Sequence, residues 1–393
     1  MRAITIGLTT STSLACCSLF AQQVELKTDN LELLQVENYF FKDHNKNGRL
    51  DDYEDWRLSP EERAAHLVSL MTVEEKAGAM LHGTLPMDQS QTPDAAGYDY
   101  PRSEEIIRKR NINHLITRIS GKLGEIAEQN NHIQKLAETS RLGIPVTVST
   151  DPRHHFQFTE GASVANAGFS QWPETLGFAA LRDPQLVKQF ANIARQEYRA
   201  TGIHMGLSPQ ADLSTEPRWS RINGTFGEDA TLAKALVQAY VEGFQNGSDG
   251  IHADSVSLVV KHWTGYGAAA EGFDSHNYYG RYAVFPGNNF DYHVIPFEGA
   301  FAANVAGVMP AYSILKDLTI QGAVTEQVGV GFNRFILTDL LKNQYGFKGI
   351  VLSDWGITRD CSRACIEGKD ESGIQGFHNF SSAWGVIDLT MEE

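Results

Sequence analysis

Charged and aromatic side chains follow several apolar runs of this sequence, at the point where each run ends. They are Asp151 after "VTVST", Lys261 and His262 in "LVVKHW", Tyr312 in "VMPAYS", and Asp354 with Trp355 in "GIVLSDWG". Carboxylates accept hydrogen bonds from hydroxyl groups, ammonium and guanidinium groups donate them, and an indole ring stacks on a pyranose face. The set predicts a site for an uncharged, polyhydroxylated ligand.

A further polar group follows the run "MGLS". It contains Asp212, Arg218 and Arg221. A charged side chain on such a loop either contacts the ligand or stabilises the loop through an ion pair. For Asp212 and Arg218 the sequence leaves both interpretations open.

The elements that would position these side chains are apolar runs separated by helical patterns. The runs are "HLITRI" (114–119), "IPVTVST" (144–150), "GIHMGLS" (202–208), "SVSLVVK" (255–261), "VAGVMPAY" (305–312) and "GIVLS" (349–353). Continuous rather than alternating apolar runs are typical of buried parallel strands. The βαβα order predicts an α/β fold with a parallel sheet or barrel, whose strand ends converge on one face.

Helix starts are marked by their capping residues. Ser59 with Glu62, and Thr72 with Glu75, each match a capping box, and Pro60 fits the first helical turn. Asp183 before a proline predicts another helix, which ends near Gly202.

These segments together resemble the N-terminal domain of glycoside hydrolase family 3, the β-glucosidase family. The resemblance rests on "STDPRHH", "EPRWSRINGTFGED", "VVKHWTGYG", "VMPAYS" and "GIVLSDWG", in matching order and spacing from about residue 60 to 393. It implies a (β/α)8 TIM-type barrel over residues 59–393, followed in the family by a second α/β sandwich domain.

The resemblance also implies roles for single residues. Asp354 looks like the catalytic nucleophile, and Asp151 like the aspartate that holds sugar hydroxyls. Further glycone contacts would be Arg221, Lys261 and His262, with Tyr312 beside the nucleophile and Trp355 at the subsite wall. The implied reaction is exo-acting hydrolysis of terminal, non-reducing β-D-glucosyl residues with retention, and it needs no organic cofactor.

A retaining glycosidase needs two carboxyl groups, a nucleophile and an acid/base residue, and the chain differs from the family in the second of these. In two-domain members the acid/base glutamate comes from the second domain, but this sequence ends at "SSAWGVIDLTMEE". Glu216, Glu228 and Glu271 match no motif for that role. We therefore expect a barrel that is incomplete at its C-terminal end, an absent second domain and impaired activity.

Two alternatives remain open. A one-domain branch of the family cleaves β-N-acetylglucosaminides with a histidine acid in "KHFPGHG…DSH". Here Thr264 and Tyr266 replace two of its residues, whereas "DSH" is present and makes His276 the residue to test. The other alternative is a non-catalytic sugar-binding remnant.

A calcium-loop template precedes the barrel segment, within an N-terminal extension at residues 22–58. "DHNKNGRLDDYE" fits D-x-[DN]-x-[DN]-G-x5-E at every fixed position. The candidate ligands for a structural calcium ion are Asp43, Asn45, Asn47, Asp51 and Glu54. Because Pro60 shortens the exiting helix, a turn shaped by Gly48 is the alternative.

Bulk properties limit the partners. The formal charge of −15 over 393 residues argues against nucleic acid and anionic membrane as partners. Residues 1–21 look like a signal peptide, which predicts a periplasmic or secreted protein, and no later stretch is apolar enough to span a membrane. Cys361 and Cys365 remain after the leader, either paired or free.

Overall fold

A parallel sheet is the centre of the computed structural model, which describes residues 23–88, 97–157, 163–165, 168–320 and 322–357. The order of the strands along the sheet is their order along the chain, and every neighbouring pair is parallel. The strands are β3 (His82–Thr84), β4 (His114–Ile116), β5 (Thr147–Thr150), β6 (Met205–Gly206), β7 (Ser257–Trp263), β9 (Gly307–Pro310) and β13 (Ile350–Val351).

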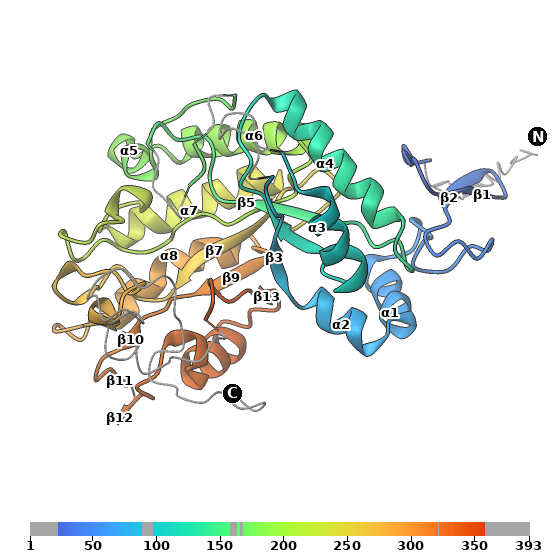
Figure 1. Cartoon of the computed structure of the whole chain (residues 1–393). Helices are drawn as coiled ribbons and strands as arrows, with labels where there is room; N and C mark the ends of the chain where they lie inside the picture. Colours follow the sequence, from blue (N-terminus) through green and yellow to red (C-terminus); the bar gives the residue numbers. More distant parts are fainter. Residues whose placement is uncertain (1–22, 89–96, 158–162, 166–167, 321, 358–393) are drawn as a thin grey trace, which may run out of the picture.

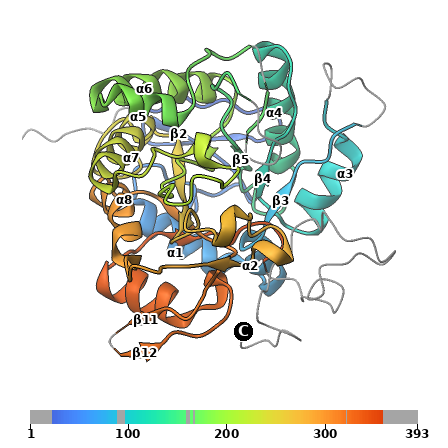
Figure 2. The same cartoon turned by 90° about the vertical axis from the view of Figure 1, so that its left-hand side faces the viewer.

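The sheet curls into a barrel wall with helices on its outer side (Figures 1 and 2). Over the described residues it has seven strands, with β3 and β13 as its two edges and no ladder between them. This confirms the predicted α/β fold, a TIM-type (β/α) barrel that is incomplete in the part described. All six predicted runs contain a strand. Only β3 was not predicted, because "HGT" carries no apolar signal.

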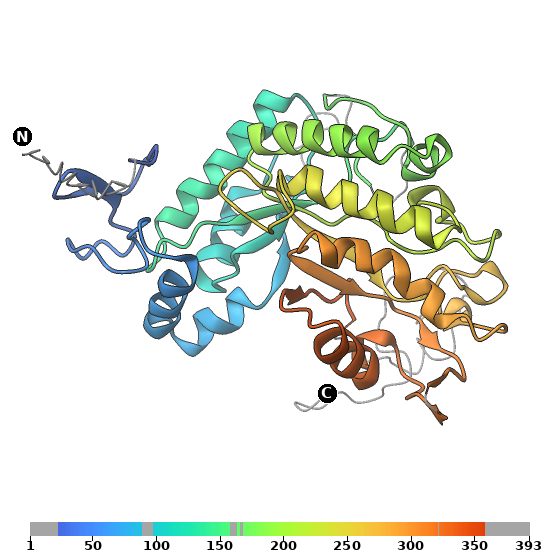
Figure 3. The ribbon, with the colours of Figure 1, turned by 180° about the vertical axis from the view of Figure 1, so that it is seen from behind.

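Helices connect successive strands and form the outer layer, which Figure 3 shows from behind. The bounds are α1 (Pro60–Leu70), α2 (Val73–Ala79), α3 (Tyr100–Glu104) continued by π-helix η2 (Glu105–Lys109), α4 (Leu123–Glu138), α5 (Thr175–Leu181), α6 (Pro184–Ala200), α7 (Ala230–Gln245), α8 (Phe290–Ala302) and π-helix η7 (Phe335–Gln344). Short 3₁₀ turns are η3 (Ile222–Gly224), η4 (Ala270–Gly272), η5 (Tyr278–Gly280) and η6 (Val330–Phe332).

Small two-stranded sheets lie outside the barrel wall. An N-terminal hairpin pairs β1 (Leu33–Val36) with β2 (Tyr39–Lys42). The remaining pairs are β8 (Tyr282–Ala283) with β10 (Ile314–Leu315), and β11 (Thr319–Ile320) with β12 (Ala323–Val324).

The predicted helix caps are present. Ser59 and Thr72 each form a full capping box, with Glu62 and Glu75 at the third helical position. The Asp183 carboxylate accepts hydrogen bonds from the first turn of α6. These bonds satisfy backbone donors that have no partner inside the helix.

Two of the three hydrophobic clusters in the described residues pack against the sheet on its opposite sides. The larger core lies between the sheet and the helices and contains Phe190, Tyr198 and Leu236. A smaller cluster inside the barrel joins Ile116, Leu207, Val259 and Met309, with Trp355 packed against it. The inner cluster therefore supports the rim from below.

Helices α6, α7 and α8 meet at glycines. A Cβ atom on Gly243 of α7 would lie 2.4 Å from Ala191 Cβ of α6. A Cβ atom on Gly299 of α8 would lie 2.1 Å from the carbonyl oxygen of Lys234 of α7. Real Cβ atoms do not approach so closely, so these glycines permit the helix spacing seen here.

We expect Gly243→Ala to destabilise the protein by roughly 1–3 kcal/mol, because the added methyl group overpacks the α6–α7 contact. Gly124→Ala is the matched control, since a Cβ there meets nothing within 4 Å and alanine favours helix. It should be neutral or stabilising by up to about 1 kcal/mol. Urea unfolding measures both, and equal effects would contradict the packing argument.

Candidate active site

The residues predicted for the site come together at the C-terminal rim of the sheet. Asp151 follows β5, Lys261 and His262 belong to the end of β7, Tyr312 follows β9, Asp354 and Trp355 follow β13, and Arg221 lies before η3. The convergence of parallel strand ends places these sequence-distant side chains on one face.

Asp151 lies between two cations. Its Oδ1 accepts a hydrogen bond from Lys261 Nζ at 3.1 Å, and its Oδ2 lies 2.6 Å from Arg118 Nη1. Burial raises the pKa of this carboxyl, but Lys261 and Arg118 outweigh burial and hold the pKa below its usual value. Oδ2 has no partner with hydrogen-bond geometry among the described residues. The site therefore offers an ionised acceptor for a ligand hydroxyl.

His262 is fixed by Asp212. The Asp212 carboxyl accepts a hydrogen bond from the His262 backbone N–H, and its Oδ2 lies 2.8 Å from His262 Nδ1. Burial raises the pKa of Asp212 to about 7, and burial first, then nearby cations, hold the pKa of His262 well below its usual value. The two groups are thus joined through one hydrogen-bond proton, and the imidazole stays neutral. Asp212 braces the site from behind.

Asp354 is the carboxylate that follows the edge strand β13. Its Oδ1 accepts a hydrogen bond from the Trp355 backbone N–H at 2.7 Å, and its Oδ2 lies 3.7 Å from His262 Nε2. Tyr312 donates to the Trp355 carbonyl at 2.7 Å. Burial, and then the charge of Asp354, raise the pKa of Tyr312 well above its usual value, so the phenol stays protonated. One Asp354 oxygen is held while the other faces the rim.

Arg221 belongs to a buried network beside these residues. It approaches Tyr266 Oη and Gln210 Oε1, each at 3.4 Å. Burial lowers the pKa of Arg221, but Tyr266, Asp274 and other acids outweigh it and raise the pKa, so Arg221 stays cationic. Asp274 accepts hydrogen bonds from Tyr266 Oη and Trp219 Nε1.

His276, the histidine of "DSH", lies at the edge of this network. Its Nδ1 bonds with Asp274 Oδ1 and lies 2.9 Å from Tyr266 Oη. Its ring centroid is 4.8 Å from that of Tyr312. The structure therefore brings the "DSH" segment to the rim.

Arg218 does not belong to the site. It pairs with Glu216 at 2.8 Å on an exposed loop, and 67% of its side chain is accessible. Of the two interpretations of Arg218, the structure therefore favours an ion pair that stabilises its own loop over a contact with the ligand.

Arg118 is the site residue that the sequence interpretation missed. It follows β4, holds Asp151, and its guanidinium lies 5.3 Å from the centroid of the Trp355 ring. The signal was present, because Arg118 sits near the end of "HLITRI", where other runs placed predicted residues.

The Asp43–Glu54 loop is closed by its own hydrogen bonds. Asp43 accepts from the backbone N–H groups of Asn47 and Gly48, and Glu54 accepts from three more in the loop. The side-chain amides of Asn45 and Asn47 donate to Asp51 Oδ2. Gly48 has a positive φ of 73°. These features match the turn alternative, and calcium binding stays a prediction.

The loop is also fastened to the barrel. Lys46 Nζ donates to the carbonyl oxygens of Glu138 and Ser140, and Tyr53 Oη donates to that of Leu142. His44 Nδ1 contacts the Gly143 carbonyl at 3.1 Å. The loop therefore covers the connection between α4 and β5.

Some predictions concern residues outside the described part of the chain. They are the leader at 1–21, the cysteines Cys361 and Cys365, and the C-terminal segment. Within the described ranges, no helix is long and apolar enough to cross a membrane. Nor do three or more His, Cys, Asp or Glu side chains there form a group that could hold a metal ion.

Comparison with known proteins gives a family match. The model of the glycosyl hydrolase family 3 N-terminal domain matches residues 72–371. The chain is 56% identical to a protein named periplasmic β-glucosidase/β-xylosidase from Dickeya chrysanthemi, over 95% of this chain and 57% of that protein. It is 48% identical to β-glucosidase C of Emericella nidulans, over 76% of this chain and 47% of that protein. The chain thus spans about half the length of the curated relatives that it matches.

Solved structures agree with the fold. A β-glucosidase from Erythrobacter marinus superposes with a TM-score of 0.63 at 25% identity, over 81% of this chain and 39% of that one. A β-glucosidase from Listeria innocua gives a TM-score of 0.57 at 24% identity, over 76% and 37%.

We expect Arg118→Met to cost about 1–3 kcal/mol of stability at pH 7, because Asp151 loses one of two cations. The pairing lowers the folded-state pKa of Asp151, so its stabilisation exists above the unfolded pKa of about 4 and is lost as the pH falls through the folded value. The deficit should therefore shrink in acid.

Urea unfolding at pH 7 and in acid measures this deficit. Arg108→Met is the control, since Arg108 and Glu104 pair with about half of each side chain exposed, and the change should stay within about 0.5 kcal/mol. A deficit that does not change with pH would contradict the assignment.

Proposed function

The chain belongs to glycosyl hydrolase family 3, and from this membership we propose that it carries the glycone site and the nucleophile of a retaining, exo-acting β-glucosidase. In this proposal the substrate is a small β-glucoside or an oligosaccharide with a terminal, non-reducing β-D-glucosyl residue. The names of the relatives from Dickeya chrysanthemi and Emericella nidulans support this sugar.

The position of Asp354 is the observation that carries the proposal. Its carboxylate lies at the same rim as the Asp151–Lys261 pair, with 10% of the side chain exposed and Oδ2 beside His262 Nε2. An accessible carboxylate next to an ionised acceptor of sugar hydroxyls is what nucleophilic attack on a bound glycoside requires.

The reaction proceeds through two displacements. Asp354 attacks the anomeric carbon while the bond to the leaving oxygen breaks, which gives a glycosyl ester and an alcohol that takes a proton from an acid. Water then attacks the same carbon, releases its proton to that group, and frees Asp354. Two inversions give overall retention.

The residues around Asp354 keep it available for attack. The Trp355 backbone N–H holds Oδ1, which leaves Oδ2 to react. His262 shares its proton with Asp212 rather than with Asp354. The cations Lys261 and Arg221 donate to sugar hydroxyls, and Asp151 accepts from them.

We further propose that the proton donor is a glutamate of a second domain like that of the two-domain members. The described glutamates considered above suit the role poorly. The ion pair with Arg218 lowers the pKa of Glu216 to about 2, whereas a general acid needs a raised pKa. Glu228 is exposed on a loop, and Glu271 is exposed in the 3₁₀ turn η4.

Two further parts of the proposal concern sugar and location. The relatives named above favour β-glucosides over acetamido sugars, although the Asp274–His276 contact keeps a histidine acid testable. Export to the periplasm or the medium is supported by the leader-like N-terminus and by the printed name of the Dickeya relative.

The first test is mechanism-based labelling with 2-deoxy-2-fluoro-β-glucosyl fluoride. Its leaving group needs little acid help, so the labelling reaction tests the nucleophile independently of the proton donor. We expect one glycosyl adduct on Asp354 by intact mass and peptide mapping. Asp354→Asn should slow labelling by on the order of 10³-fold or more, and Asp339→Asn, at an exposed site, should not. An adduct elsewhere would overturn the assignment.

The second test compares aryl β-glucosides with aryl N-acetyl-β-glucosaminides that carry activated leaving groups. We expect the glucoside to be preferred at least about tenfold in kcat/KM. If His276 were the acid, His276→Phe would slow substrates with poor leaving groups far more than activated ones. That result, together with acetamido preference, would favour the alternative.

A further inference from the structure

Side chains from the opposite edge of the sheet contact the indole ring of Trp355. The Arg118 guanidinium, after β4, lies 5.3 Å from the ring centroid of Trp355. The ring centroid of His82, on the edge strand β3, lies 6.5 Å away at an interplanar angle of 51°. Both separations are in the range of cation–π and aromatic contacts. No ladder joins β3 to β13 within the described residues, so these side chains make a contact that no strand pairing provides.

His82 is itself fixed by Ser149. Its Nε2 lies 2.6 Å from Ser149 Oγ, and Ser149 is fully buried on β5. This hydrogen bond spans the strand β4, which lies between β3 and β5. Burial, and then the neighbouring His114, lower the pKa of His82 to about 4, so its imidazole is neutral near pH 7. A neutral ring adds no second positive charge beside Arg118.

The backbone of Trp355 connects this ring contact to the nucleophile. Its N–H donates to Asp354 Oδ1 at 2.7 Å, and its carbonyl oxygen accepts from Tyr312 Oη at 2.7 Å. A displaced indole would therefore move the peptide groups that set the direction of the Asp354 carboxylate.

The strand before Asp354 gives this segment little support of its own. β13 contains only Ile350 and Val351, and it pairs with β9 alone. So short an edge strand offers few ladder hydrogen bonds to fix the residues that follow it. The position of the Asp354–Trp355 segment thus depends on side-chain contacts.

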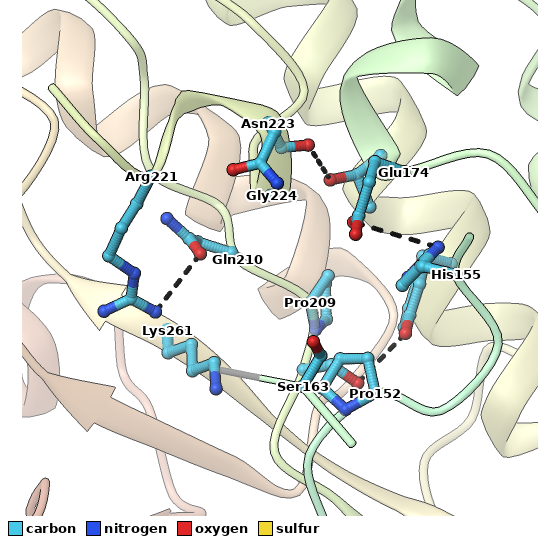
Figure 4. A pocket seen from close by; sticks show the side chains of 13 residues that line it. Pro152, His155, Ser163, Glu174, Pro209, Gln210, Arg221, Asn223, Gly224 and Lys261 are labelled. Carbon is cyan, nitrogen blue, oxygen red and sulfur yellow. Dashed lines mark hydrogen bonds and ion pairs between the residues drawn. The ribbon is translucent and has the colours of Figure 1, made fainter. Parts of the chain in front are cut away.

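The contact between His82 and Trp355 is separate from the cavity beside Lys261. That cavity is lined from the loops after β5 and β6, from α5 and α7, and from the end of β7, and its polar lining includes Arg221 and Glu174 (Figure 4). Neither His82 nor Trp355 lines it. A substitution at His82 therefore leaves the lining of this cavity unchanged.

We propose that His82 is a positioning residue, which together with Arg118 holds the Trp355 indole and thereby fixes the direction of the Asp354 carboxylate. This inference rests on the proposed function and deepens it, because it extends the residues that serve the nucleophile to the edge strand β3. Loss of His82 should slow attack on the bound sugar more than it weakens binding, since a small misplacement of a reacting group costs much of its rate.

The test labels the full chain with 2-deoxy-2-fluoro-β-glucosyl fluoride at a series of concentrations. Intact mass gives the labelling rate at saturation and the half-saturating concentration. We expect His82→Ala to lower the saturated rate at least about tenfold and to change the half-saturating concentration less than about threefold. His82→Phe keeps a ring beside Trp355 and should restore the rate to within about threefold of the wild type.

His66→Ala is the matched control, because His66 also has one hydrogen bond and one ring contact, both with Tyr53, and lies on α1. It should change neither quantity. A raised half-saturating concentration at an unchanged saturated rate in His82→Ala, or no change in either, overturns the inference. Labelling of the wild type on Asp354 keeps the proposed function in both cases.

Hydrogen exchange followed by mass spectrometry tests the contact without a substrate. Peptides that cover residues 350–357 should exchange about threefold faster or more in His82→Ala than in the wild type or His66→Ala, because the segment loses a side-chain contact. Unchanged exchange there overturns the inference. A folded wild type that the reagent does not label contradicts the proposed function, and the exchange measurement then decides separately whether His82 holds the Trp355 segment.

Discussion

Placing one buried carboxylate between two cations is the constraint on which the rim depends. Asp151 follows β5, Arg118 follows β4 and Lys261 ends β7, so three strands contribute to one charge cluster. Removing a carboxylate from water is costly unless cations replace the lost solvation. The sheet must therefore curl enough to bring the ends of β4 and β7 within reach of β5.

The same rule of compensated charge extends around the rim. Asp212 and His262 share a proton, and Arg221 keeps its charge because acids and phenols surround it. Charge compensation at the rim is thus made by neighbouring side chains from different strands, as in the ion pairs of Asp151 with Arg118 and Lys261.

The fold could be predicted from the sequence more completely than the site could. Apolar runs predicted six strands because burial on both faces demands them, whereas the edge strand β3 has too little apolar surface to be recognised. Residue types at strand ends predicted the acceptors and donors, because parallel strands deliver their ends to one face. Gln210, Glu174 and the bracing role of Asp212 depend on loop paths that only tertiary packing decides. The Asp43–Glu54 loop matched a template, but its attachment to the α4–β5 connection depends on carbonyl groups that no motif specifies.

The glycine contacts among α6, α7 and α8 have a mechanical consequence. At Gly243 and Gly299 the helix backbones lie too close for an intervening side chain, so no rotamer change at these points can absorb a shift of one helix against the next. A change in the shape of the rim is therefore more readily made in the loops that follow β5, β6 and β7 than in the helices behind them.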